Sequence, residues 1–133
     1  MKKLAFLTLG VILFSSCLND DTPNFTYGFV AIDEATTPTS FTYGEKDTIY
    51  LKYTLPNSCY HFNDVYYEYE DTTRIVAVRA FIDLDVECIE EEIEKEYELI
   101  VNVTQEEDYL FKFYKGKDID GENIFEEVVI PVN

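Results

Sequence analysis

Apolar and polar residues alternate strictly in two segments of the chain. Over residues 48–55, Ile49, Leu51, Tyr53 and Leu55 occupy every second position. Over residues 109–115, large aromatic side chains do the same. A period of two places successive side chains on opposite faces of an extended backbone. Both segments are therefore predicted to be strands with one buried face.

Further extended runs lie between turn-forming residues. We expect them over residues 25–32, 65–70, 74–82, 97–103 and 124–132. Asp71-Thr72-Thr73 predicts a hairpin turn, and residues 34–40 predict a loop. Pro131 has no backbone N–H to donate, so it indicates an edge strand or the end of pairing.

Residues 87–98 are harder to assign, because seven of these twelve residues are glutamate. Ile89, Ile93 and Tyr97 recur at a spacing of four, which favours a short helix on the sandwich. Glu90 and Glu94 oppose it, because like charges at this spacing repel. We expect a mobile loop or a helical turn.

About seven short strands with regular turns predict an all-β fold, a single Greek-key sandwich of immunoglobulin or fibronectin III type over residues 24–133. Residues 109–113 also resemble the penultimate strand of such domains, which often opens with a tyrosine. The chain departs from antibody domains in its short cysteine spacing and its lack of tryptophan. The resemblance is therefore one of pattern.

Composition supports one folded domain and excludes one class of partner. The chain has 133 residues, of which 47% are hydrophobic, as in ordinary globular proteins. Its formal net charge of -17 is not offset by a basic stripe. Nucleic acid is excluded as a partner, because its phosphates would be repelled.

The N-terminus has the pattern of an export signal. Lys2 and Lys3 precede an apolar run over residues 4–14, which is followed by Ser15, Ser16 and Cys17. The run is shorter than the roughly 20 residues that span a bilayer, so a cleaved secretory signal over residues 1–16 is favoured over a permanent transmembrane helix.

Leu13-Phe14-Ser15-Ser16-Cys17 resembles a bacterial lipobox, although bulky Phe14 departs from its commonest form. This resemblance implies that Cys17 is acylated and becomes the mature N-terminus, followed by a polar tether to residue 23. An ordinary secretory signal with a nearby cysteine is the alternative.

Leu18-Asn19-Asp20-Asp21 resembles the acidic export stretch of Bacteroidota lipoproteins. It implies a lipid-anchored protein of the outer membrane, on either the periplasmic or the cell-surface face.

With Cys17 acylated, Cys59 and Cys88 are the two remaining cysteines. Exported proteins enter an oxidising compartment, so we expect these cysteines to form a disulfide. A metal site or a catalytic thiol would require partners that the sequence does not supply, because His61 is the single histidine.

Candidates for catalysis and metal binding are weak. Ser58 lies close to His61 in sequence, but this proximity does not make a catalytic triad. We expect no enzymatic activity and no cofactor. The run containing Asp118, Asp120 and Glu122 superficially resembles a calcium loop, but its spacing favours a hairpin turn. Similarly, Asp83, Asp85 and Glu87 favour a solvated acidic face over a calcium site.

Four tyrosines, Tyr60, Tyr66, Tyr67 and Tyr69, form the candidate ligand-binding group. Outward tyrosines stack on sugars or anchor protein interfaces, whereas core packing is the alternative explanation. The lack of tryptophan counts against a glycan platform. Asp47-Thr48-Ile49 and Asp71-Thr72-Thr73 also resemble Bacteroidota O-glycosylation sites, with threonine as the acceptor.

These patterns favour a non-enzymatic outer-membrane lipoprotein that binds or assembles with an envelope or extracellular partner, either a protein or a glycan. The alternative is a sugar-binding accessory lipoprotein of a polysaccharide uptake system. A hydrolase would require a cleft converging on His61 or on a pair of carboxylates.

Overall fold

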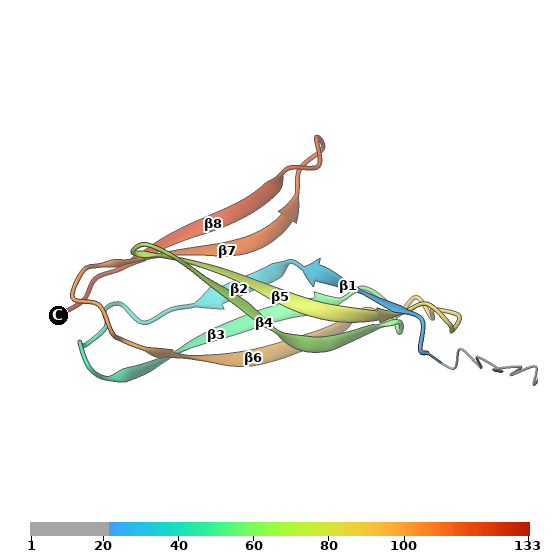
Figure 1. The fold of residues 1–133 in the computed structure, drawn as a ribbon, viewed down its shortest axis with the longest axis horizontal. Helices are drawn as coiled ribbons and strands as arrows, with labels where there is room; N and C mark the ends of the chain where they lie inside the picture. Colours follow the sequence, from blue (N-terminus) through green and yellow to red (C-terminus); the bar gives the residue numbers. More distant parts are fainter. Residues whose placement is uncertain (1–21) are drawn as a thin grey trace, which may run out of the picture.

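The computed structural model describes residues 22–133 and confirms the all-β class, with eight strands in two packed sheets (Figure 1). The predicted signal peptide 1–16, Cys17 and most of the tether lie outside the described residues. Within residues 22–133, no helix has the length and apolar character needed to cross a bilayer.

The smaller sheet has three antiparallel strands in the order β2-β3-β6. Their bounds are Ile32–Thr36 for β2, Lys46–Leu55 for β3 and Ile93–Asn102 for β6. The alternation predicted over residues 48–55 is confirmed, since Ile49, Leu51, Tyr53 and Leu55 all point into the core.

The larger sheet has five strands: β1 (Phe25–Val30), β4 (Tyr60–Glu70), β5 (Thr73–Asp83), β7 (Tyr109–Lys117) and β8 (Asn123–Ile130). Strand β5 pairs with β4 along one side; on its other side it pairs first with β7 and then with β1. The β5–β7 pair is parallel, which differs from the antiparallel sheets of immunoglobulin domains. The β7–β8 hairpin extends away from β1 and β5 (Figure 1).

The expected single strand over residues 25–32 is wrong. The chain leaves β1 of the larger sheet at Val30, crosses at Ala31 and enters β2 of the smaller sheet at Ile32. Val30 and Ile32 are both buried, so the apolar alternation continues through the crossing. Consequently β2 also includes Glu34, Ala35 and Thr36, which we expected in a loop.

The helical turn considered for residues 87–98 is also wrong. Residues 87–92 lie in a loop, and β6 begins at Ile93. Glu94, Glu96 and Glu98 alternate with Tyr97 and Leu99, which contribute to the core. The glutamates are tolerated because they occupy the solvent side of this strand.

The predicted disulfide between Cys59 and Cys88 is present, with 5.2 Å between their Cα atoms. Cys59 is fully buried, whereas Cys88 belongs to the exposed loop 84–92. The bond therefore fastens this loop to the sandwich just before β4.

Tyr109 opens the penultimate strand, as the pattern implied. Its side chain is buried, and its hydroxyl accepts a hydrogen bond from the Thr104 N–H at 3.0 Å. A tyrosine that bonds back to the preceding backbone is typical of the corner in immunoglobulin-like sandwiches.

Candidate binding surface

The outward side of the larger sheet carries an unusual concentration of aromatic rings. Tyr27 of β1 lies opposite Phe81 of β5, while the next pair along these strands, Gly28 and Ala80, lies on the core side, where Ala80 is fully buried. We call this surface the aromatic face and define it by Phe25, Tyr27, Phe29, His61, Tyr66, Phe81, Tyr114 and Phe125.

Strand β1 supplies the most exposed part of this face. Phe25, Tyr27 and Phe29 retain 43%, 56% and 50% of their surface in contact with solvent. Between them lies Gly28, where an added Cβ would lie 3.1 Å from Ile82 Cδ1. The glycine therefore lets β1 lie close to β5, and its aromatic neighbours point outward.

The rings pack edge to face in two groups. In the first, Phe25 lies 5.4 Å from Tyr27 at an interplanar angle of 88° and 6.1 Å from Phe81 at 79°. In the second, Phe29 lies 5.5 Å from Tyr66 at 67° and 5.9 Å from Tyr114 at 63°. Such edge-to-face contacts fix the rings relative to one another.

Each group lines a shallow depression. The first hollow has a volume of about 370 Å³ and is lined by Pro23, Asn24, Phe25, Tyr27, Phe81, Asp83 and Asp85. The second hollow has a volume of about 330 Å³ and is lined by Phe29, Tyr66, Glu68, Ile75, Ala77, Tyr114, Asn123 and Phe125. Both volumes are at the small end of ligand sites, which suits single side chains better than a large ligand.

An ion pair on the same face includes Arg79, which pairs across strands with Phe29. Its Nε and Nη2 donate to Asp64 Oδ1 at 2.7 Å and Oδ2 at 2.5 Å. The hydrogen bond from Arg79 lowers the pKa of Asp64, and the same contact raises the pKa of Arg79. Both groups are therefore charged at neutral pH and satisfy one another.

The four candidate tyrosines do not share one face. Tyr66 lies on the aromatic face and donates to Glu68 at 2.7 Å, and this bond raises its pKa. Tyr60 and Tyr67 pack against the core, and burial raises the pKa of Tyr67 to about 12. Tyr69 is 68% exposed and contacts Arg74. Sequence reasoning missed the Phe25, Tyr27 and Phe29 stripe, although its alternation was visible.

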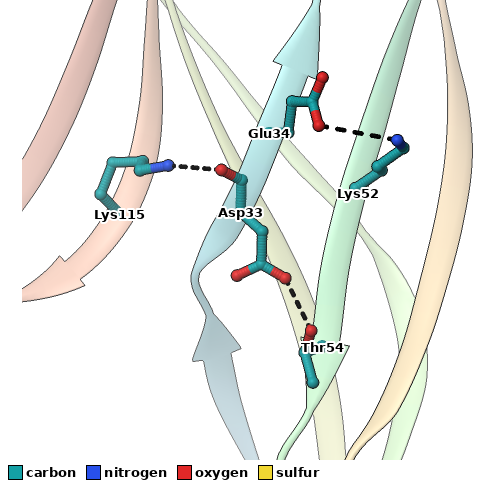
Figure 2. Close-up of polar contacts among 5 residues, drawn as sticks. All are labelled: Asp33, Glu34, Lys52, Thr54 and Lys115. Carbon is teal, nitrogen blue, oxygen red and sulfur yellow. Dashed lines mark hydrogen bonds and ion pairs between the residues drawn. The ribbon is translucent and has the colours of Figure 1, made fainter.

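Another hollow, about 500 Å³, lies on the smaller sheet and is lined mainly by charged residues. Figure 2 shows Glu34 paired with Lys52 at 3.6 Å and Thr54 donating to the Asp33 carboxylate at 2.7 Å. Lys115 donates to the Asp33 carbonyl at 2.8 Å. These contacts stabilise the region around β2. The lining is mostly charged, in contrast to the aromatic lining of the other two hollows.

The outward side of the smaller sheet carries mainly charged and polar side chains, unlike the aromatic face. We call it the charged face and define it by Glu34, Thr36, Tyr50, Lys52, Thr54, Glu94, Glu96, Glu98 and Ile100. Its two large exposed hydrophobic side chains, Tyr50 and Ile100, lie among polar neighbours.

Asp118, Asp120 and Glu122 form a hairpin turn. Asp118 Oδ1 accepts the backbone N–H groups of Asp120 and Glu122, each at 2.9 Å. Gly121 has a φ of 79°, which favours glycine. Among residues 22–133, no three His, Cys, Asp or Glu side chains are grouped to hold a metal ion.

Asp83, at the end of β5, and Asp85, in the following loop, connect this loop to the residue that precedes β1. Asp85 Oδ2 accepts the Asn24 N–H at 2.9 Å, and Asp83 Oδ1 accepts the Asp85 N–H at 2.9 Å. Glu87 is exposed in the loop. These contacts place two carboxylates at the rim of the first hollow.

Ser58 and His61 are engaged separately. Ser58 Oγ accepts the Ile89 N–H at 2.7 Å, while the His61 ring stacks on Phe81 at 4.7 Å. Within the part of the chain that the structure describes, no hydrogen bond joins the two side chains.

No known protein family, curated protein or solved structure matches this chain. Function is therefore inferred from the geometry of the two outer faces.

Proposed function

We propose that this protein is a non-enzymatic lipoprotein of the outer membrane, whose aromatic face binds an envelope or extracellular partner. The observation that carries this proposal is the aromatic stripe on β1, where three successive outward residues are each about half exposed. Exposed apolar surface is unfavourable in water, and contiguous patches of it are typical of interaction sites.

The anchor in this proposal is Cys17, supported by its lipobox-like context. Strand β1 begins at Phe25, eight residues later. A fully extended chain of that length spans about 28 Å. The first hollow includes Pro23 and Asn24, so it would lie close to the membrane. Asp20 and Asp21 favour display on the cell surface.

The test is site-specific photocrosslinking in intact cells that express the full chain. A photoreactive residue replaces Tyr27 in one strain and Tyr50 in another, because these tyrosines are 56% and 51% exposed on opposite outer faces. We expect a discrete adduct from position 27 and none from position 50. Equal adducts at both positions, or none at position 27, would contradict the proposal.

The anchor has its own test. Cys17→Ser should move the protein out of the membrane fraction without changing its melting temperature, since residue 17 precedes every strand. Retention of the serine variant in membranes after a high-salt wash would exclude the lipid anchor. Protease treatment of intact cells then distinguishes surface display, where the wild-type protein is digested, from the periplasmic face.

A sugar-binding accessory protein of a polysaccharide uptake system would use the same face, because aromatic rings also stack on sugars. This alternative predicts that a polysaccharide affinity gel depletes the purified protein from solution. It also predicts that Tyr27→Ser abolishes this depletion and that Tyr50→Ser does not.

A further inference from the structure

We infer that the partner of the aromatic face is a protein that inserts one apolar side chain into each of the two hollows, from a surface bordered by lysine and arginine. The inference rests on the proposed function and specifies the chemistry of the partner. It is carried by three observations: ring orientation, the spacing of the hollows and the sign of the rim charges.

The first observation concerns the rings. A sugar stacks on a flat ring face and forms many hydrogen bonds. Here the rings in both hollows form five pairs at interplanar angles of 61° to 88°, and one face of Phe81 is already covered by the His61 ring, which stacks on it at 23°. Four of the rings in the hollows belong to phenylalanine, which has no hydrogen-bonding group: Phe25, Phe29, Phe81 and Phe125. Concave sites lined by ring edges and faces suit apolar side chains, as at the centres of protein interfaces.

The second observation is the spacing. Phe25 and Tyr27 line the first hollow, and Phe29 lines the second. On β1, the midpoint of Phe25 and Tyr27 lies three residues from Phe29, or about 10 Å along a strand. On β5, the first hollow is lined by Phe81 and Asp83 and the second by Ile75 and Ala77, and the two midpoints lie six residues, or about 20 Å, apart. Side chains two to four turns apart on a helix cover this range of about 10 to 20 Å. One helix of a partner therefore reaches both hollows.

The third observation is charge. Asp83 and Asp85 border the first hollow, and Glu68 borders the second. Arg79 supplies a positive charge on this face, but Asp64 neutralises it, and Lys112 pairs with Glu127 at 3.8 Å. Lys117 lies opposite Asn123 of the second hollow, so the excess of acidic charge is clearest at the first hollow. An apolar centre with an acidic rim is complementary to an apolar centre with a basic rim.

The same charges disfavour the other occupants. A second copy would bring acidic rims together between chains that each have a net charge of -17, and like-charge contacts reduce affinity. Anionic lipid and anionic glycan would be repelled for the same reason. The Arg79–Asp64 pair can be covered by a partner without leaving an unpaired charge, because its bidentate hydrogen bonds remain intact.

The test uses intact outer membranes and the full lipid-anchored chain, with a photoreactive residue at position 27 for the first hollow or at position 125 for the second. We expect both positions to give an adduct of the same mass, which protease destroys and periodate does not change. Melting temperatures of both variants establish that they fold.

The double variant Asp83→Asn and Asp85→Asn tests whether the acidic rim of the first hollow attracts the partner. It removes both negative charges and preserves the hydrogen-bond acceptors of both side chains. We expect the double variant to give about fivefold less adduct from position 27. High salt should cause a similar loss when Asp83 and Asp85 are unchanged, because it screens their charges. The control is Glu96→Gln and Glu98→Gln on the charged face, which removes the same charge and should leave the yield unchanged.

Three results would overturn the inference while leaving the proposed function intact: an adduct sensitive to periodate and resistant to protease, an adduct consisting of two copies of this chain, or equal yields from the two double variants. Failure of both positions to give any adduct would overturn the proposed function as well.

Discussion

The two outer faces follow the same strand geometry but carry different cross-strand pairs. On the smaller sheet, Lys52 of β3 lies opposite Glu34 of β2 and Glu96 of β6. On the larger sheet, Tyr27 of β1 lies opposite Phe81 of β5. Opposite charges stabilise a pair that remains in water, whereas aromatic pairs in water retain apolar surface for a partner to cover.

Two tyrosines show that exposure alone does not distinguish the two outer faces. Tyr27 and Tyr50 are 56% and 51% exposed. Tyr50 lies opposite Thr36 and Glu98 and diagonal to Ile100, so no aromatic residue lies opposite it. Tyr27 contacts the Phe25 ring and lies opposite Phe81. The neighbours of each ring, not its exposure, distinguish the faces.

The largest effect should come from the disulfide beside the aromatic face. Replacing Cys59 and Cys88 with serine should lower the free energy of unfolding by about 3.6 kcal/mol, because the bond closes a loop of about 29 residues in the unfolded chain. Denaturant titration measures this loss. Amide exchange should accelerate both in loop 84–92 and in the core of β3, because core amides exchange through global unfolding and the free energy of that unfolding has fallen. Unchanged exchange in β3 would contradict the predicted loss.

Phe29→Ala should destabilise the protein more than Ile100→Ala. Phe29 contacts the rings of Tyr66 and Tyr114, whereas Ile100 is 60% exposed on the charged face. We expect losses of about 1 to 2 kcal/mol for Phe29 and about 0.5 kcal/mol or less for Ile100. Thermal unfolding of both variants makes the comparison, and equal losses would show that the rings do not stabilise one another.

The ion pair on the aromatic face predicts a pH dependence. The pKa of folded Asp64 is lowered from 3.8, chiefly by its hydrogen bond to Arg79. Its stabilising contribution is therefore present above the unfolded value and is lost as the pH falls through the lowered folded value. The stability difference between wild type and Asp64→Asn should shrink in acid below pH 3.8, as followed by denaturant titration at several pH values.

Glu34→Gln is the control on the charged face, because it breaks a longer and more exposed pair with Lys52. Its effect should be small at neutral pH. A loss from Glu34→Gln that equals or exceeds the loss from Asp64→Asn would reverse the ranking of the two ion pairs.

The smallest effect should come from calcium at the hairpin tip. Asp118 Oδ1 already accepts two backbone N–H groups. Millimolar calcium should therefore change the melting temperature by less than about 1 °C. A rise of many degrees that disappears in the Asp118→Asn and Asp120→Asn variant would reveal a cation site.

The strands that were predictable from sequence are those with one continuously buried face. Ile49, Leu51 and Tyr53 remain on the core side throughout β3, so their alternation identified the strand correctly. In contrast, β1 and β2 bury Val30 and Ile32 in the same core from different sheets. A change of sheet that keeps the burial pattern leaves no signal in the sequence.

The candidate tyrosines were misleading because β4 contains a bulge. The register shifts between Phe62 and Asp64, so side-chain parity changes within the strand. Tyr60 therefore faces the core before the bulge, and Tyr67 faces it afterwards. Closeness in sequence consequently did not predict a shared surface.

The aromatic stripe on β1 was visible in the sequence, but its direction was not. Alternating aromatic residues usually suggest a buried face, yet apolar residues also occur in the surface. Pairing with β5 turns Val30 inward and Phe25, Tyr27 and Phe29 outward. This orientation depends on a strand about 50 residues later in the chain, so a local pattern could not determine it.

The most direct test of the aromatic face is hydroxyl-radical footprinting of Tyr27 and Tyr50, first in the purified protein and then in native outer membranes. Their similar exposures predict similar labelling of the purified protein. In membranes, we predict that labelling of Tyr27 falls several-fold while that of Tyr50 stays the same, because a partner covers one face and not the other. Equal labelling of the two tyrosines in native membranes would contradict this account.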